Sequence, residues 1–338
     1  MTSVDRLGKE TLKVAIIGIG KMGILHASIL NTLPDVKLTA FCDKSALIRK
    51  FCAKLLPKVH VVDDLEKFSN LDLDAVYVTT PISSHYSVIK TIYSNEIARN
   101  VFAEKTLAAN YDEAKELCKL AQHFAGVNMV GYMRRFAVTF KKAKDLLNED
   151  SIGKVVSFNA YAYSSDFSNI KNNSKASMSR GGVLRDLGAH IIDLALWFFG
   201  DLEVNSAKIG SLNATGSEDY AYFRVKNLDG LEGQFDISWV KENYRLPEFG
   251  LILRGSRGCL EVNDDKVELT TDGAKSFKWY RHDLNDSAGF LLGSTEYFSE
   301  DQHFIRSVLN GDKAEPSFHT SSKIDWIVDQ VNRRAGQE

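Results

Sequence analysis

The sequence has little of what marks secreted, membrane-spanning or nucleic-acid-binding proteins. It contains only four cysteines in 338 residues, without CxxC spacing or a histidine at zinc-ligand spacing, which favours reduced thiols. No apolar run is long enough to span a membrane, and the polar first residues lack the apolar core of a signal peptide. A net charge of −2 gives no general attraction to nucleic acid or an anionic membrane. We therefore expect a cytoplasmic protein that binds neither.

Apolar runs of strand length alternate with amphipathic segments of helix length from residue 12 to about residue 130. The predicted strands are 12–17, 36–42, 75–79, 101–103 and 127–130, and the predicted helices between them are 22–33, 45–56, 84–95 and 111–124. Strands buried on both faces and separated by helices are typical of a doubly wound parallel sheet. The pattern predicts an α/β domain over residues 1–132.

The pattern changes beyond Gly153, where short strands follow one another closely. The predicted strands are 155–163, 220–225, 234–240, 250–254, 258–262 and 266–270. Turn-like segments at 227–230 and 263–265 favour antiparallel hairpins. One predicted helix at 182–199 interrupts the series, and two more at 294–309 and 319–332 end the chain. We predict an α+β domain over residues 133–338 with an open, mostly antiparallel sheet, whose last helices can pack back on the first domain.

A glycine motif, Gly18-Ile-Gly20-Lys-Met-Gly23, joins the first predicted strand to the first predicted helix. Gly18 permits the tight turn, Gly20 lets the backbone approach a pyrophosphate, and Gly23 lets helix and strand pack closely. The free N–H groups at the helix start then bind phosphate. A purely structural turn is the alternative. We predict a Rossmann domain whose cofactor contacts here are Gly18, Gly20, Lys21, Met22 and Gly23.

Asp43 ends the second predicted strand, where a dinucleotide-binding fold places the acid that bonds the adenosine ribose. A carboxylate there repels a 2′-phosphate, so it favours NAD over NADP. The neighbouring Lys44 and Ser45 could accommodate that phosphate and leave NADP open. Asp43 could also serve only as a helix N-cap.

Two polar segments follow the next two strands, at the edge of the sheet where ligands bind. Thr80, Pro81 and His85 could flank the cofactor, although His85 could equally make a structural bond. Glu104 and Lys105 follow the predicted strand 101–103. Lys105 could hydrogen-bond a substrate oxygen during hydride transfer, or it could be a surface lysine paired with Glu104.

Asp186, His190 and Asp193 recur at i, i+4 and i+7 on an otherwise apolar predicted helix. This spacing puts them on one helix face. An imidazole oriented by a carboxylate is suited to acid–base work near neutral pH. A structural His–Asp pair at the domain interface is the alternative. Only one histidine is present, so we predict no metal site.

Together these features resemble the Gfo/Idh/MocA family of oxidoreductases, which includes inositol and sugar dehydrogenases and glucose–fructose oxidoreductase. The resemblance covers nearly the whole chain and includes Arg135-Phe136 after the predicted strand 127–130. It implies that Lys105 and His190 flank the reacting carbon and that Asp186 lines the sugar site. Asp193 matches the family's motif too, but its position one turn further along the helix indicates a structural role. The resemblance also implies a homodimer or homotetramer formed through the open sheet.

The chain departs from the family at Thr106, which replaces the proline of the usual Glu-Lys-Pro sequence. A cis peptide bond before a residue other than proline costs about 3–4 kcal/mol. We therefore predict a trans bond, or a freer loop, after Lys105.

The sequence thus predicts an NAD(P)-dependent dehydrogenase or reductase that acts on a secondary alcohol or ketone of a sugar, nucleotide-sugar or cyclitol. Lys105, His190 and Asp186 are its candidate catalytic residues. A dinucleotide-binding, sugar-responsive regulator and a redox glycosidase that retains its NAD are the alternatives. Weaker candidates for substrate contact are Tyr161, Tyr163, Asp166, Arg180, Tyr244 and Arg245.

Overall fold

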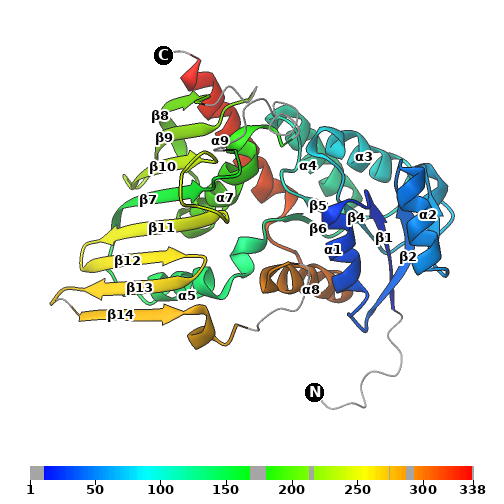
Figure 1. Cartoon of the computed structure of the whole chain (residues 1–338), viewed down its shortest axis with the longest axis horizontal. Helices are drawn as coiled ribbons and strands as arrows, with labels where there is room; N and C mark the ends of the chain where they lie inside the picture. Colours follow the sequence, from blue (N-terminus) through cyan, green and yellow to red (C-terminus); the bar gives the residue numbers. More distant parts are fainter. Residues whose placement is uncertain (1–10, 168–179, 213–216, 274, 287–292, 337–338) are drawn as a thin grey trace. The chain divides into compact units, whose positions relative to one another are not determined.

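Two compact units make up the chain in the computed structural model (Figure 1). The structure describes residues 11–167, 180–212, 217–273, 275–286 and 293–336. The first unit comprises Met1–Gly131 and Gly289–Ser322, and the second comprises Tyr132–Ala288 and Lys323–Glu338. The chain therefore leaves the first unit, builds most of the second, and returns to the first before it ends in the second.

A six-stranded, fully parallel sheet forms the centre of the first unit, in the order β3-β2-β1-β4-β5-β6. Its strands are β1 (Leu12–Ile17), β2 (Val36–Cys42), β3 (His60–Val62), β4 (Ala75–Val78), β5 (Asn100–Glu104) and β6 (Asn128–Gly131). This sheet confirms the predicted doubly wound, Rossmann-like architecture. The strand order reverses between β1 and β4, which is the switch point where such sheets bind ligands.

Helices from both ends of the sequence cover this sheet. They are α1 (Lys21–Leu30), α2 (Ala46–Leu55), α3 (Ile82–Ser94), α4 (Tyr111–Phe124) and α8 (Thr295–Asn310), with a 3-10 turn η1 (Leu65–Phe68). Helix α8 packs against α1, and α3 packs against α4. Tyr77 of β4 stacks on Phe102 of β5 at 4.5 Å, and Phe304 of α8 contacts both rings. These aromatic contacts fix the late helix α8 to the centre of the first unit.

An eight-stranded sheet forms the second unit, in the order β14-β13-β12-β11-β7-β10-β9-β8. Its strands are β7 (Val155–Tyr163), β8 (Glu203–Gly210), β9 (Tyr220–Lys226), β10 (Glu232–Ser238), β11 (Glu248–Gly255), β12 (Gly258–Asn263), β13 (Lys266–Thr271) and β14 (Lys275–Tyr280). Every neighbouring pair is antiparallel except β7 and β10, which run parallel. The prediction of a mostly antiparallel sheet is confirmed.

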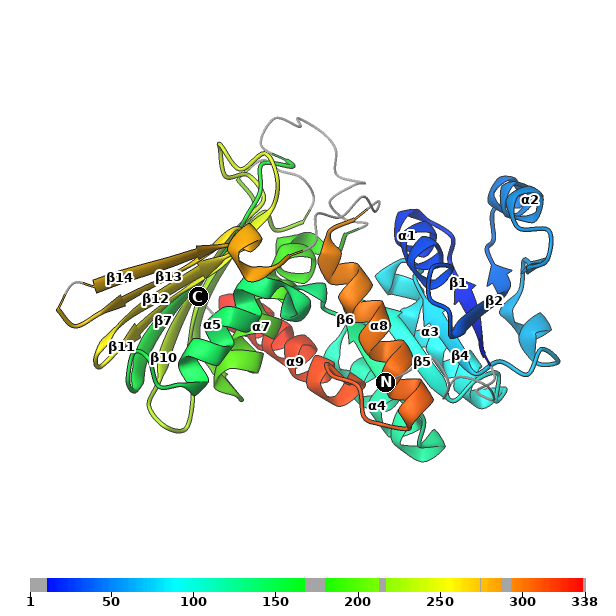
Figure 2. The same ribbon diagram turned by 90° about the horizontal axis from the view of Figure 1, so that it is seen from below.

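The helices of the second unit lie on one face of this sheet (Figure 2). They include α5 (Val138–Asn148) and α7 (Ala189–Phe199), while the last helix, α9 (Phe318–Ala335), belongs to this unit from Lys323 onward. The remaining short helical segments are η2 (Met133–Phe136), the π-helical turn η3 (Leu184–Gly188) and η4 (Arg281–Leu284). Within the described ranges, no helix is long and apolar enough to cross a membrane.

Candidate functional site

The glycine loop of the first unit connects β1 to α1 at the switch point of the sheet. Gly18 has a φ of +91°, and a Cβ atom there would lie 2.8 Å from Cγ2 of Thr80. The Thr79 hydroxyl donates a hydrogen bond to the Gly18 carbonyl oxygen at 2.6 Å. Only glycine combines this backbone conformation with such close contact. The loops that follow β1 and β4 are therefore held against each other.

Gly20 and Gly23 have different surroundings. A Cβ atom on Gly23 would collide with the Gly18 carbonyl oxygen, whereas one on Gly20 would meet nothing within 4 Å. Gly20 is the N-cap of α1, and no side chain in the described part of the chain caps this helix start. Lys21 is exposed and Met22 half-buried in the first helical turn. Uncapped N–H groups beside open space fit the phosphates of a dinucleotide.

Replacing Gly20 with alanine should weaken dinucleotide binding and leave the fold intact. Its Cβ atom meets no protein atom, so the melting temperature should stay near that of the wild type. The same methyl group would stand where a pyrophosphate must approach the backbone, and we expect about a tenfold higher Kd, which corresponds to roughly 1.4 kcal/mol. Titration calorimetry with NAD measures the Kd. An unchanged Kd would exclude this loop as the phosphate site.

Asp43 links the end of β2 to the glycine loop. Its Oδ2 accepts a hydrogen bond from the Ile19 N–H at 2.7 Å, and its Oδ1 accepts one from the Ser45 N–H at 2.7 Å. Ser45, and not Asp43, is the N-cap of α2. The Asp43 carboxylate is half-buried and Lys44 is exposed. Since a carboxylate offers about four lone-pair sites, Asp43 can still accept hydrogen bonds from ribose hydroxyls.

His85 connects the loop after β4 to the loop after β5. Its Nδ1 lies 2.8 Å from the carbonyl oxygen of Thr106, and its Nε2 lies 2.8 Å from that of Thr80. The ring is completely buried, and this burial lowers its pKa, although the two carbonyl oxygens oppose the shift. Pro81, at the start of α3, is exposed. Both ring nitrogens of His85 thus have main-chain carbonyl partners, and a contact of His85 with the cofactor stays a prediction.

The peptide bond between Lys105 and Thr106 is cis, so the predicted trans bond is wrong. Thr106 is completely buried, and its hydroxyl donates to the carbonyl oxygen of Ala108 at 3.1 Å. Its own carbonyl oxygen contacts His85. Burial and these tertiary hydrogen bonds outweigh the local preference for a trans bond on which the prediction rested.

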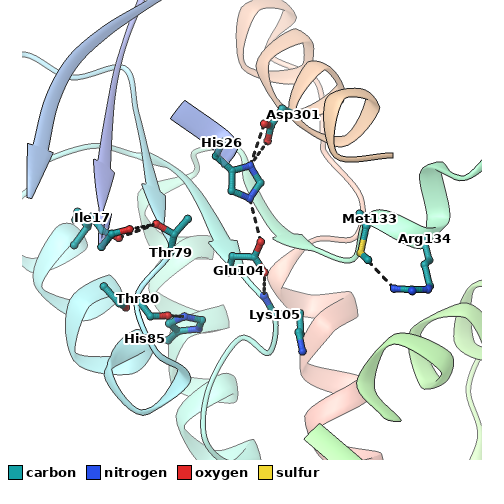
Figure 3. A network of polar contacts seen from close by, with 11 residues as sticks. Ile17, His26, Thr79, Thr80, His85, Glu104, Lys105, Met133, Arg134 and Asp301 are labelled. Carbon is teal, nitrogen blue, oxygen red and sulfur yellow. Dashed lines mark hydrogen bonds and ion pairs between the residues drawn. The ribbon is translucent and has the colours of Figure 1, made fainter. Parts of the chain in front are cut away.

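A row of buried charged groups leads to Lys105 (Figure 3). The Lys105 N–H donates to Oε2 of Glu104 at 3.1 Å, and Oε1 of Glu104 lies 3.0 Å from Nε2 of His26. Nδ1 of His26 lies 2.8 Å from Oδ1 of Asp301 on α8. We call Glu104, His26 and Asp301 the Glu-His-Asp cluster. Sequence analysis missed His26 and Asp301.

Burial and charge act in opposite directions on this cluster. Burial alone would lower the pKa of His26, but Asp301 and then Glu104 raise it well above its ordinary value. Burial would raise the pKa of Glu104, whereas the hydrogen bond and charge of His26, together with the charge of Lys105, lower it below its ordinary value. The cluster therefore favours a charged imidazolium beside an ionised Glu104.

His190 and Asp193 of the second unit lie on α7, and both are buried. The His190 ring meets Tyr132 and Phe249 edge-on at 6.0 and 5.5 Å. Arg135 binds Asp193 through two nitrogens, Nη2 at 2.7 Å from Oδ1 and Nε at 2.8 Å from Oδ2. Asp193 therefore forms a buried ion pair with Arg135, a contact compatible with the structural role predicted for it.

Asp186 lies on the π-helical turn η3 that precedes α7, so the spacing of a regular α-helix does not hold between Asp186 and His190. Its Oδ2 lies 3.2 Å from Nη1 of Arg180, and the same nitrogen lies 2.8 Å from Oδ2 of Asp166. The structure thus brings together three candidates, Asp166, Arg180 and Asp186.

The tyrosine candidates lie on the other face of the sheet from His190. Phe249, which contacts His190, pairs in register with Ala162 of β7, and side chains alternate between faces along a strand. Tyr161 and Tyr163 therefore point away from His190, and their hydroxyls donate to Glu248 and Asp236 at 2.7 and 2.6 Å. Tyr244 packs on Tyr163 at 5.0 Å, and Arg245 is exposed.

Metal-binding geometry is not found in the described ranges, where no three or more His, Cys, Asp or Glu side chains are grouped so as to hold a metal ion.

Comparison with protein-family models finds two matches. Residues 12–132 match the Gfo/Idh/MocA oxidoreductase family, NAD-binding Rossmann fold, and residues 140–261 match the Gfo/Idh/MocA C-terminal domain. These matches cover the glycine loop, Lys105 and His190.

Curated proteins and solved structures agree with this. The chain is 27% identical to the D-glucoside 3-dehydrogenase of Escherichia coli (strain K12), over 95% of this chain and 93% of that protein. It is 22% identical to the inositol 2-dehydrogenase of Rhizobium meliloti (strain 1021), over 91% and 92%. A levoglucosan dehydrogenase in complex with NADH shares the fold, with a TM-score of 0.87, 17% identity, and coverage of 97% of this chain and 98% of that one. The curated relatives also include two scyllo-inositol 2-dehydrogenases of Bacillus subtilis (strain 168), one with NAD(+) in its name and the other with NADP(+).

Proposed function

Because the chain belongs to the Gfo/Idh/MocA family of NAD-binding oxidoreductases, we propose that it oxidises a secondary alcohol, or reduces the corresponding ketone, of a sugar, nucleotide-sugar or cyclitol. Relatives that align over nearly the whole chain are named as a glucoside 3-dehydrogenase and an inositol 2-dehydrogenase. Both substrates are rings that carry several adjacent hydroxyl groups. A ring of this kind is the substrate class that we propose.

The observation that carries this proposal is the arrangement at one edge of the parallel sheet. The glycine loop follows β1, Asp43 follows β2 and Lys105 follows β5, all at the carboxyl ends of strands in one sheet. This is the edge where open parallel sheets bind their ligands. When bound, the nicotinamide supplies the hydride acceptor or donor. The protein supplies phosphate and ribose contacts from the loop and Asp43, and an ammonium group from Lys105.

Lys105 and His190 have complementary roles in the proposed reaction. The Lys105 ammonium group hydrogen-bonds the substrate oxygen and stabilises the charge that develops on it. His190 takes the hydroxyl proton during oxidation and returns it during reduction, a task suited to an imidazole. Asp186 binds a neighbouring hydroxyl group and orients the ring, with Arg180 holding its carboxylate. Alignment of substrate with cofactor supplies much of the remaining rate acceleration.

A substrate screen tests this function. NAD and NADP, oxidised and reduced, are offered with a panel of sugars, cyclitols and UDP-sugars while the nicotinamide absorbance is followed. We expect a substrate-dependent change of absorbance with at least one ring polyol. Binding of the dinucleotide without turnover would instead indicate a regulator, and hydrolysis of a glycoside without net change in the cofactor would indicate a redox glycosidase.

Asp43 should make the enzyme prefer NAD. Its carboxylate would repel the 2′-phosphate of NADP, and we expect about a tenfold lower Kd for NAD, which corresponds to roughly 1.4 kcal/mol. Replacing Asp43 with serine removes the charge and should reduce this preference to near unity. Parallel titrations with NADH and NADPH measure the ratio of the two Kd values in the wild type and in the variant. A wild-type preference for NADPH would contradict the role of Asp43.

We also propose that the protein forms a homodimer or homotetramer through the open face of the second unit's sheet. That face carries Tyr161, Tyr163, Asp236 and Glu248, and these polar and aromatic groups hydrogen-bond one another. Light scattering measures the oligomeric state.

A further inference from the structure

The Glu-His-Asp cluster is buried beside a residue of the proposed site. His26 and Asp301 have no solvent exposure, and Glu104 is 9% exposed. Each ring nitrogen of His26 faces a carboxylate oxygen, Glu104 at 3.0 Å and Asp301 at 2.8 Å. A neutral imidazole has one N–H and would turn a lone pair toward one of these carboxylates. The imidazolium donates to both. Burial alone would lower the pKa of His26, but Asp301 and then Glu104 raise it well above its ordinary value, so charge and geometry together favour the imidazolium.

The charges of the cluster are balanced around that imidazolium. Burial raises the pKa of Asp301, and the charge and hydrogen bond of His26 oppose this shift. With both carboxylates ionised, the imidazolium leaves one net negative charge, and the charge of Lys105 helps to lower the pKa of Glu104. Without the imidazolium, two buried carboxylates would face each other across residue 26, and one of them would retain a proton, because burial and like charges disfavour ionisation.

Two tyrosines also face the His26 ring, Tyr77 on β4 at 5.5 Å and Tyr297 on α8 at 6.2 Å. Burial and then the charges of Asp301 and Glu300 raise the pKa of Tyr77 well above its ordinary value, so this group stays neutral.

We infer that His26 is a positioning residue for Lys105. Its imidazolium, kept charged by Asp301, keeps Glu104 ionised and turned so that the second oxygen of Glu104 holds the main-chain N–H of Lys105. The late helix α8 thereby helps to place the first residue after β5. This inference rests on the proposed role of Lys105, but its structural part can be measured without any substrate.

A packing role for His26 is the alternative that the experiment must separate. The ring lies 5.1 Å from Phe102 and 5.5 Å from Tyr77, so any substitution also disturbs aromatic contacts. The variants His26→Gln, Asp301→Asn and the double variant separate charge from packing. The double variant restores the single net negative charge of the wild type but leaves the packing defect of His26→Gln. His123→Gln, an exposed histidine on α4, is the matched control.

We expect His26→Gln to lower kcat about tenfold at neutral pH, the scale of a modest misplacement of a catalytic group. KM and the Kd for NAD should change less than twofold. The remaining activity should rise with pH as the carboxyl group that retained a proton ionises, and the pH profile of the wild type should lack this rise. The double variant should recover kcat to within about threefold of the wild type. A wild-type kcat and pH profile in His26→Gln, or a further loss of kcat in the double variant, would overturn the inference.

Nuclear magnetic resonance tests the same inference without an activity assay. In enzyme labelled with ¹⁵N, both ring nitrogens of His26 should remain protonated well above pH 6.5, and the Lys105 amide signal should shift in His26→Gln and return in the double variant. A neutral His26 ring near pH 7 would refute the inference. If the His26 ring signals and the Lys105 amide signal behave as expected but the protein turns over no substrate, only the proposed function is refuted.

Discussion

Replacing Lys105 with methionine should lower kcat on the true substrate about a hundredfold or more, the loss expected for a group that assists proton transfer. Methionine keeps an unbranched apolar chain of similar length and removes only the ammonium group. The hydrogen bond from the Lys105 N–H to Glu104 belongs to the main chain and should survive. We therefore expect the Kd for NADH and the melting temperature to remain near the wild-type values. Steady-state kinetics measures kcat, a fluorescence titration with NADH measures the Kd, and thermal unfolding measures the melting temperature.

Three further variants extend this test. Lys54→Met removes an exposed lysine from the last turn of α2 and should leave kcat unchanged. In Lys105→Ala, small primary amines added to the assay should restore part of the rate, because they supply the missing group. His190→Asn should show a loss of similar size, since it removes the group that exchanges the proton. A Lys105→Met variant with the full rate would remove Lys105 from the reaction.

The fold could be predicted from the sequence where burial leaves a clear pattern. The bounds of β1, β2 and β7 coincide with the predicted ones, because runs buried on both faces and strict alternation are both strong signals. The strands that were missed have weak patterns. β3 has three residues, and β8 lies at an edge of its sheet with a register shift between Val204 and Ser206. β14 lies at the other edge with mostly exposed side chains. Its pairing with β13 depends on the neighbouring strand and not on its own sequence.

The candidate site could be predicted only where its residues are close in sequence. The glycine loop is one continuous motif, and its turn follows from local geometry. His26 and Asp301 are 275 positions apart, so only the folded first unit brings them together. A possible signal was His26 itself, which lies three residues after Gly23 on the helix that begins at the phosphate loop. The cis bond before Thr106 depends likewise on burial and on distant contacts.

Residue type alone does not show on which face of a sheet a side chain lies. Tyr161 and Tyr163 were chosen as polar aromatic residues near a strand end, but the register of β7 with β11 puts them on the face away from His190. The residues of β7 that alternate with the tyrosines are the buried ones, Phe158, Ala160 and Ala162. The same register places Phe249 against His190, a contact that no motif predicted.

Replacing Arg135 with methionine should destabilise the second unit by about 3–5 kcal/mol. Arg135 and Asp193 are 8% and 1% exposed, and the substitution leaves the Asp193 carboxylate buried without its guanidinium partner. Since Asp193 and His190 share α7, this loss should also reduce activity at high temperature. All four tryptophans, Trp197, Trp239, Trp279 and Trp326, lie in the second unit. Tryptophan fluorescence during urea unfolding therefore reports the stability of that unit.

The loss of stability in Arg135→Met should come from burying the Asp193 charge without the guanidinium, and not from the attraction of the ion pair itself. Adding Asp193→Leu to Arg135→Met replaces the pair with apolar groups and should recover most of the lost stability, because such replacements are often neutral or stabilising. Arg257→Met is the matched control, since Arg257 and its partner Asp150 are 58% and 68% exposed. It should cost less than about 1 kcal/mol. If Arg135→Met cost no more than this control, the buried pair would not be what stabilises α7 against η2.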